Sequence, residues 1–213
     1  MSITANLKRI QNEIGPNVKC VVVTKGKSIQ EMMAIQKAGA QIIAENRVQE
    51  AERKWGSSHP SNPTSASTER HLIGHLQTNK VKQAVRLFDV IQSVDSVRLA
   101  ERLNEEGIRC GKTIRIMVQI NIGEEPQKYG FSPEEVGGAL AQIDSMGHLS
   151  VEGLMTIVPY RENPEETRPY FRAMAKLHKE LSHHHGLSNK FELSMGMSHD
   201  YRIAIEEGAT MVR

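Results

Sequence analysis

The stretch Cys20-Val21-Val22-Val23-Thr24, followed shortly by a helical pattern that begins at Ser28, decides the fold class. Such a nearly continuous run of β-forming residues is typical of a parallel strand covered on both faces. Ser28 and Glu31 have the spacing of a capping box, and the apolar residues after them repeat at helical spacing until Gly39. A buried strand followed by an amphipathic helix is the repeating unit of parallel α/β folds.

The same unit recurs along the chain. Apolar residues at helical spacing predict a further helix ahead of the first strand, over 3–14. The other predicted strands are 41–44, 71–73, 90–94, 113–121, 149–155, 191–195 and 210–213. The helices predicted after strands two to seven are 46–54, 78–87, 96–106, 133–146, 164–184 and 199–207. The Ser-, Thr- and Pro-rich segment 56–68 is predicted to be an exposed loop.

Eight strands that alternate with helices predict a single (β/α)₈ TIM barrel with an extra N-terminal helix, formed by residues 1–213 as one domain. The alternative is an open doubly wound sheet. Its simplest dinucleotide-binding version is excluded because no Gly-x-Gly-x-x-Gly follows the first strand.

The composition limits the classes of partner. Hydrophobic residues make up 38% and aromatic residues 4%, which predicts an aliphatic core, and the formal net charge of +2 indicates neither a nucleic-acid nor a membrane partner. The two cysteines, Cys20 and Cys110, form no Cys-x-x-Cys pair, which favours a reducing compartment. No signal-peptide pattern or transmembrane run is visible. We expect a soluble cytoplasmic protein.

The polar residues at the strand ends are the candidates for chemistry, because the active site of a barrel lies at the carboxyl ends of its strands. Lys25 ends the first strand. It is either a charge whose stem lies along apolar surface or a functional amine. A partly desolvated lysine has a lowered pKa and becomes nucleophilic toward carbonyls, which is the chemistry of Schiff-base formation.

The turn Ser194-Met195-Gly196-Met197-Ser198 follows the seventh strand and precedes a helix. Such a turn presents backbone N–H groups, and the phosphate site of barrels commonly follows strands seven and eight. The alternative is an ordinary turn in which Ser198 caps the helix. Arg213, at the end of the eighth strand, either faces the same cavity or lies on the surface. No metal site is assigned, because the consecutive residues His183-His184-His185 point in different directions on a helix.

Eight strings carry a family resemblance. They are Val22-Val23-Thr24-Lys25, Glu45-Asn46-Arg47-Val48-Gln49-Glu50, His71-Leu72-Ile73-Gly74-His75-Leu76-Gln77-Thr78-Asn79-Lys80, Gln119-Ile120-Asn121-Ile122, Lys128-Tyr129-Gly130, Gly153-Leu154-Met155, Leu193-Ser194-Met195-Gly196-Met197-Ser198-His199-Asp200 and Gly208-Ala209-Thr210-Met211-Val212-Arg213. In this order, over nearly the whole chain, they resemble the pyridoxal phosphate homeostasis protein family. The strings that begin at His71 and at Leu193 are together highly specific.

The resemblance implies a barrel of PLP fold type III, like the N-terminal domain of alanine racemases. It implies pyridoxal 5′-phosphate (PLP) as the cofactor, held as a Schiff base, and a role in PLP homeostasis without established catalytic turnover. The implied site consists of Lys25 as the Schiff-base lysine, Asn46 beside the cofactor, Met155 near the ring, Ser194, Gly196, Met197 and Ser198 as the phosphate-binding turn, and Arg213 facing the pyridine nitrogen. The implied partners are PLP itself and PLP-dependent apoenzymes as recipients, and we expect a monomer.

One departure and two alternatives accompany the resemblance. The family continues past the arginine with Ile-Gly, a small hydroxylated residue and a final helix, whereas this sequence ends at Arg213, so we expect a weaker phosphate cup and lower stability. The first alternative is a PLP-dependent amino-acid racemase, which needs a second domain and a tyrosine base from a partner subunit. The second is a barrel that binds a phosphorylated metabolite without a covalent bond.

Overall fold

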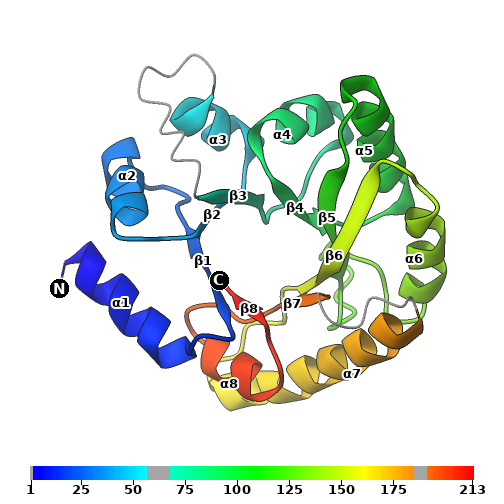
Figure 1. Cartoon of the computed structure of the whole chain (residues 1–213). Helices are drawn as coiled ribbons and strands as arrows, with labels where there is room; N and C mark the ends of the chain where they lie inside the picture. The colour runs from blue at the N-terminus through cyan, green and yellow to red at the C-terminus, as the bar shows by residue number, and fades with distance from the viewer. Residues whose placement is uncertain (1, 57–67, 185–190) are drawn as a thin grey trace.

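Parallel strands close into a barrel in the computed structural model, which describes residues 2–56, 68–184 and 191–213 (Figure 1). Residues 57–67 of the predicted loop and His185 therefore lie outside the described part, while 183 and 184 are described as backbone of a helix. The strands are β1 (Lys19–Val23), β2 (Ile42–Glu45), β3 (Glu69–Leu72), β4 (Val90–Val94), β5 (Ile114–Ile120), β6 (Leu149–Thr156), β7 (Glu192–Ser194) and β8 (Met211–Val212). They are hydrogen-bonded in chain order, and β8 returns to pair with β1. The predicted (β/α)₈ barrel is confirmed.

Helices surround the strands and cover the outer face of the barrel (Figure 1). They are α1 (Ile3–Ile14), α2 (Ile29–Lys37), α3 (Val48–Trp55), α4 (Val81–Leu87), α5 (Val97–Cys110), α6 (Val136–Asp144), α7 (Arg168–His184) and α8 (Tyr201–Glu206), with short 3₁₀ turns η1 (Thr78–Lys80) and η2 (Pro164–Thr167). The extra N-terminal helix and the capping box of Ser28 with Glu31 are confirmed. None of the described helices combines the length and apolar character needed to cross a membrane.

Some predicted helix ends were wrong, each for a local reason. The helix predicted at 199–207 begins only at Tyr201, and its N-cap residue is Asp200 rather than Ser198. The helix predicted to end at residue 106 continues to Cys110, because Gly111 supplies the left-handed residue that ends it, with φ +62°. The helix predicted from residue 164 begins as the tighter turn η2, a common form at helix N-termini.

Two apolar clusters stabilise this arrangement. The larger one fills the space between the strands and the helices and includes Trp55, Phe171 and Leu103. The smaller one takes side chains mainly from the strands and packs inside the barrel: Val21, Ile42, Ala44, Ile73, Val90, Met117, Met155 and Met211. Both clusters are dominated by aliphatic residues, in agreement with the composition.

Candidate functional site

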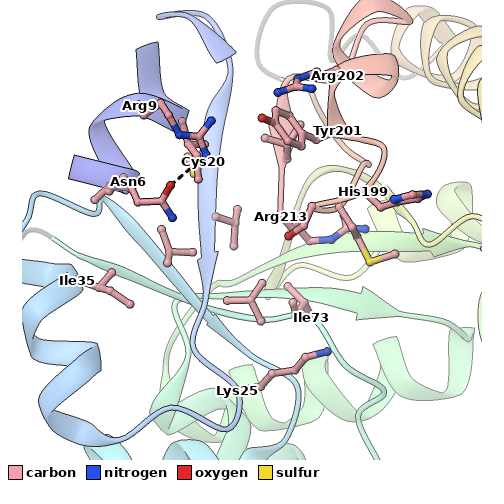
Figure 2. A pocket seen from close by; sticks show the side chains of 18 of the residues that line it. Asn6, Arg9, Cys20, Lys25, Ile35, Ile73, His199, Tyr201, Arg202 and Arg213 are labelled. Atoms are coloured by element: carbon pink, nitrogen blue, oxygen red, sulfur yellow. Dashed lines mark hydrogen bonds between the residues drawn. The ribbon is translucent and has the colours of Figure 1, made fainter. Parts of the chain in front are cut away.

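A cavity of about 730 Å³ opens at the carboxyl ends of β1 and β8 (Figure 2). Its lining includes Lys25, Asn46, Met197, Ser198 and Arg213. The cavity also extends along β1 toward α1, where Asn6 and Arg9 lie at the far end of the row of lining side chains from Lys25 (Figure 2). The barrel thus brings together residues from both ends of the sequence.

Lys25 lies one residue beyond the buried Thr24, on the exposed loop between β1 and α2. Its amine lines the cavity and has no hydrogen-bond or ion-pair partner among the described residues. It is also the one lysine among the described residues that line this cavity. Lys25 is therefore a primary amine that faces the cavity and remains available to a ligand.

A buried ion cluster of Glu45, Glu50 and Lys54 holds the backbone on both sides of Lys25. Lys54 Nζ donates to Glu45 Oε1 at 2.6 Å, to Glu50 Oε1 at 2.8 Å and to the Thr24 carbonyl oxygen at 2.5 Å. The Gly26 amide donates to Glu50 Oε1 at 2.6 Å. Because Thr24 and Gly26 flank Lys25, the cluster sets where the Lys25 backbone lies.

The pKa values of the two carboxyl groups in this cluster are shifted in opposite directions. Burial raises the pKa of the Glu45 carboxyl, while the Lys54 ammonium and the Thr24 hydroxyl oppose the rise. Although burial also acts on Glu50, the Lys54 ammonium and the Gly26 amide hold its pKa below the ordinary value. The sequence alone did not predict the contacts among these three side chains. A lysine and a glutamate four residues apart on a helix do not by themselves reveal burial.

Lys54→Met is expected to destabilise the fold by about 3 kcal/mol, because removing one partner of a buried ion pair leaves uncompensated charge behind. Urea denaturation measures the change. The matched control is Lys176→Met, which removes another helical i,i+4 pair whose lysine side chain is 79% exposed. We expect no measurable change in the control. Equal effects in the two variants would contradict a structural role of the buried cluster.

Asn46 follows β2 directly and lines the cavity. Its Oδ1 atom is buried and has no hydrogen-bond donor among the described residues. An unsatisfied buried acceptor is costly, and such atoms are rare in folded proteins. Asn46 therefore lines the cavity and carries a buried acceptor that has no donor among the described residues.

The turn after β7 contributes backbone groups to the cavity. Gly196 has φ +88°, and a Cβ there would approach Ala204 Cβ to 2.6 Å, so a residue without a side chain is required. The Asp200 carboxylate accepts a hydrogen bond from the Met197 amide at 2.7 Å. Ser198 and His199 are exposed and line the cavity, and their amides have no acceptor among the described residues. Unpaired backbone N–H groups in a turn can bind an anion.

Arg213 lies beside this turn and is held on three sides. Its amide donates to the Gly196 carbonyl oxygen at 3.0 Å, Nη1 donates to Ser194 Oγ at 2.7 Å and Nη2 donates to the Thr156 carbonyl oxygen at 2.7 Å. Burial lowers the pKa of the guanidinium to about 10, while Asp200 opposes the fall. The group thus remains a cation at neutral pH, and it is fixed at the cavity rather than frayed on the surface.

Three of the predicted site residues, Met155, Ser194 and Gly196, are not among the residues that line the cavity. Ser194, the last residue of β7, is fully buried, and its hydroxyl donates to Gln92 Oε1 at 2.7 Å. Met155, in β6, is also fully buried and belongs to the interior apolar cluster. Among the described residues, no group of His, Cys, Asp or Glu side chains is arranged to hold a metal ion.

Comparison with known proteins identifies the family of this chain. The family model described as "Alanine racemase, N-terminal domain" matches residues 1–213. The chain is 39% identical over 175 residues to the pyridoxal phosphate homeostasis protein of Aquifex aeolicus, covering 82% of this chain and 74% of that protein. It is 34% identical over 223 residues to the protein of the same name from Haemophilus influenzae, covering 100% and 93%.

A solved structure extends the comparison to the fold. PipY of Synechococcus elongatus PCC7942, described with PLP bound, superposes with a TM-score of 0.89 at 32% identity, covering 100% of this chain and 97% of PipY. The family match thus spans the whole sequence, and the barrel matches along its whole length. This chain belongs to the alanine racemase N-terminal domain family and, within it, to the pyridoxal phosphate homeostasis proteins.

Proposed function

We propose that this protein binds PLP, holds it covalently through Lys25 and maintains the level of the cofactor in the cell. One observation carries the proposal: the Lys25 amine lines the cavity, at the position of the family's lysine string, and has no partner among the described residues. The PLP-bound relative PipY supports the same cofactor. Lys25 would hold the cofactor covalently through Nζ, and the aldehyde oxygen of PLP would leave as one water molecule.

The other lining groups fit the remaining parts of the cofactor. The amides of Ser198 and His199, together with the turn at Gly196 and Met197, would receive the phosphate, because backbone N–H groups bind phosphate oxygens. The free Asn46 Oδ1 would accept a hydrogen bond beside the ring. Met155 and Ser194 would support the pocket from below.

Arg213 would decide what chemistry the bound cofactor can support. When bound, PLP acts as an electron sink whose strength depends on protonation of the ring nitrogen. The Arg213 cation facing that nitrogen would keep a proton off it. A weak electron sink suits a protein that stores or hands over PLP better than an enzyme that forms carbanions.

Residues 1–213 would act as one PLP-binding domain. The protein would be a monomer in the cytoplasm, and PLP-dependent apoenzymes would receive the cofactor from it. The Schiff base at Lys25 and the absence of turnover are part of this proposal. Racemisation of alanine above the background rate would overturn the non-enzymatic part while leaving the binding part intact.

Mixing the purified protein with PLP is expected to produce the visible absorbance band of a lysine-bound cofactor. Borohydride reduction followed by peptide mass spectrometry should then locate the adduct on Lys25. The control omits borohydride, and in that sample the adduct should be lost on denaturation. PLP that binds reversibly without a borohydride-fixed adduct would contradict the covalent proposal and favour a non-covalent phosphate-binding barrel.

A further inference from the structure

A column of polar side chains runs through the apolar interior of the barrel. Arg213 Nη1 donates to Ser194 Oγ, Ser194 Oγ donates to Gln92 Oε1, and Gln92 Nε2 lies 2.7 Å from His71 Nδ1. His71 Nε2 lies 3.2 Å from Glu69 Oε2. Glu69 is the first residue of β3 and Arg213 follows the last residue of β8. The column therefore connects the amino-terminal end of the barrel to the cavity at its carboxyl end.

These polar residues are not needed to fill the barrel. Ser194 and Gln92 are fully buried, and His71 is 1% exposed. Side-chain layers inside such barrels are normally bulky and apolar, as Val90 and Met117 are here. A buried polar group costs stability unless it is hydrogen-bonded, and an apolar side chain at position 92 would carry no such cost. A role outside packing accounts for them better.

The hydrogen bonds of the column run in one donor-to-acceptor order, and Glu69 fixes that order. Hydrogen bonds from His71 and then Arg115 lower the pKa of the Glu69 carboxyl to about 2, so it is ionised at neutral pH. An ionised carboxylate at His71 Nε2 places a proton on that nitrogen, and the Gln92 Nε2 donor at 2.7 Å then faces Nδ1 as the acceptor. Gln92 must then turn its NH₂ group to His71 and its oxygen to Ser194.

The orientation of Gln92 determines what Ser194 can offer to Arg213. With Gln92 Oε1 as the acceptor, the Ser194 proton points to Gln92, and the Ser194 lone pairs face Arg213. Gln92 Nε2 also lies 3.2 Å from Met211 Sδ, which opposes rotation of the amide. If the Gln92 amide were reversed, Arg213 Nη1 and Gln92 Nε2 would both donate to Ser194 Oγ. The Ser194 proton would then have no acceptor on Gln92.

We infer that Glu69, His71, Gln92 and Ser194 form an interior relay that positions the Arg213 guanidinium at the cavity. The four are positioning residues: they act on the ligand only through Arg213. This inference rests on the proposed function in one respect, namely that Arg213 faces the bound cofactor. The relay itself is a property of the protein without ligand, so its failure can be separated from failure of PLP binding.

The ligand-free protein provides the first test. Histidine labelled with ¹⁵N is expected to show a proton on His71 Nε2 and a lone pair on Nδ1, and the His71→Asn variant assigns the signal. Gln92→Glu has the same size but places a carboxylate at Nδ1, so His71 is expected to become doubly protonated at neutral pH. A proton on Nδ1 with Nε2 unprotonated in the unaltered protein would overturn the relay.

The second test measures PLP. Gln92→Leu removes two hydrogen bonds of the relay, and we expect PLP to bind about tenfold more weakly, with a shifted visible absorbance band. The matched control is Met117→Leu, a volume-conserving change inside the same barrel, which should preserve both affinity and spectrum. If Gln92→Leu folds and matches the control in both measurements, the positioning role is refuted. Thermal melts of both variants report folding separately.

Discussion

Lys25→Ala is expected to abolish the borohydride-fixed PLP adduct completely while leaving the thermal midpoint of the protein unchanged. The adduct is lost because no other lysine among the described residues lines the cavity. Stability is retained because the Lys25 side chain is exposed and has no partner among the described residues. Mass spectrometry of the intact reduced protein and a thermal melt measure the two quantities on one sample.

Lys27→Ala is the matched control for this experiment. Lys27 lies on the same loop, but it does not line the cavity and pairs with Glu31 at 3.7 Å. The control should therefore form the adduct to the same extent as the unaltered protein. An adduct that persists in Lys25→Ala, or one that disappears in Lys27→Ala alone, would show that Lys25 is not the attachment site.

Gly153→Ala is expected to destabilise the fold by about 3 kcal/mol, which for a chain of this length lowers the melting temperature by about 6–12 °C. A Cβ at position 153 would lie 2.1 Å from the Glu192 carbonyl oxygen and 2.7 Å from its carbonyl carbon. Both are backbone atoms of β7, so rotation of a side chain cannot relieve the clash. Strand β7 must move, and Ser194 moves with it.

The same substitution at Gly138 provides the control. Gly138 is an exposed residue of α6, and a Cβ there would meet no atom within 4 Å. Alanine in a helix interior is favoured over glycine, so Gly138→Ala should stabilise the protein by about 0.5–1 kcal/mol. Opposite signs for the two alanines would attribute the loss at position 153 to the close approach of β7. A neutral Gly153→Ala would contradict it.

The interior relay and the buried ion cluster have a common consequence for a PLP-binding protein. The ion cluster holds the loop that carries the amine, and the relay holds the cation on the other side of the cavity. Both sets of contacts are made within the protein, so the fold itself fixes the backbone on either side of Lys25 and the Arg213 guanidinium. Such preorganisation lowers the cost of binding, because fewer groups lose conformational freedom.

The sequence by itself determined the succession of elements, because each depends on residues that are close together in the chain. The run at Val21 to Val23, the Ser28 capping box and the regular return of both patterns were sufficient to predict the barrel. Lys25 and Arg213 were found as polar residues at strand ends. Gln92 was missed, although a polar residue in the middle of the predicted strand 90–94 needs a partner and could have indicated it.

Only the tertiary structure decided which of these residues meet. Gln92 and Ser194 are 102 positions apart, and Lys54 and Thr24 are 30 apart, yet each pair is in hydrogen-bond contact. In the structure, Ser194 lies in the interior rather than in the predicted turn, and Asp200 rather than Ser198 is the N-cap residue. The physical reason is barrel closure: local patterns set each strand and helix, but the pairing of β8 with β1 brings distant polar atoms together.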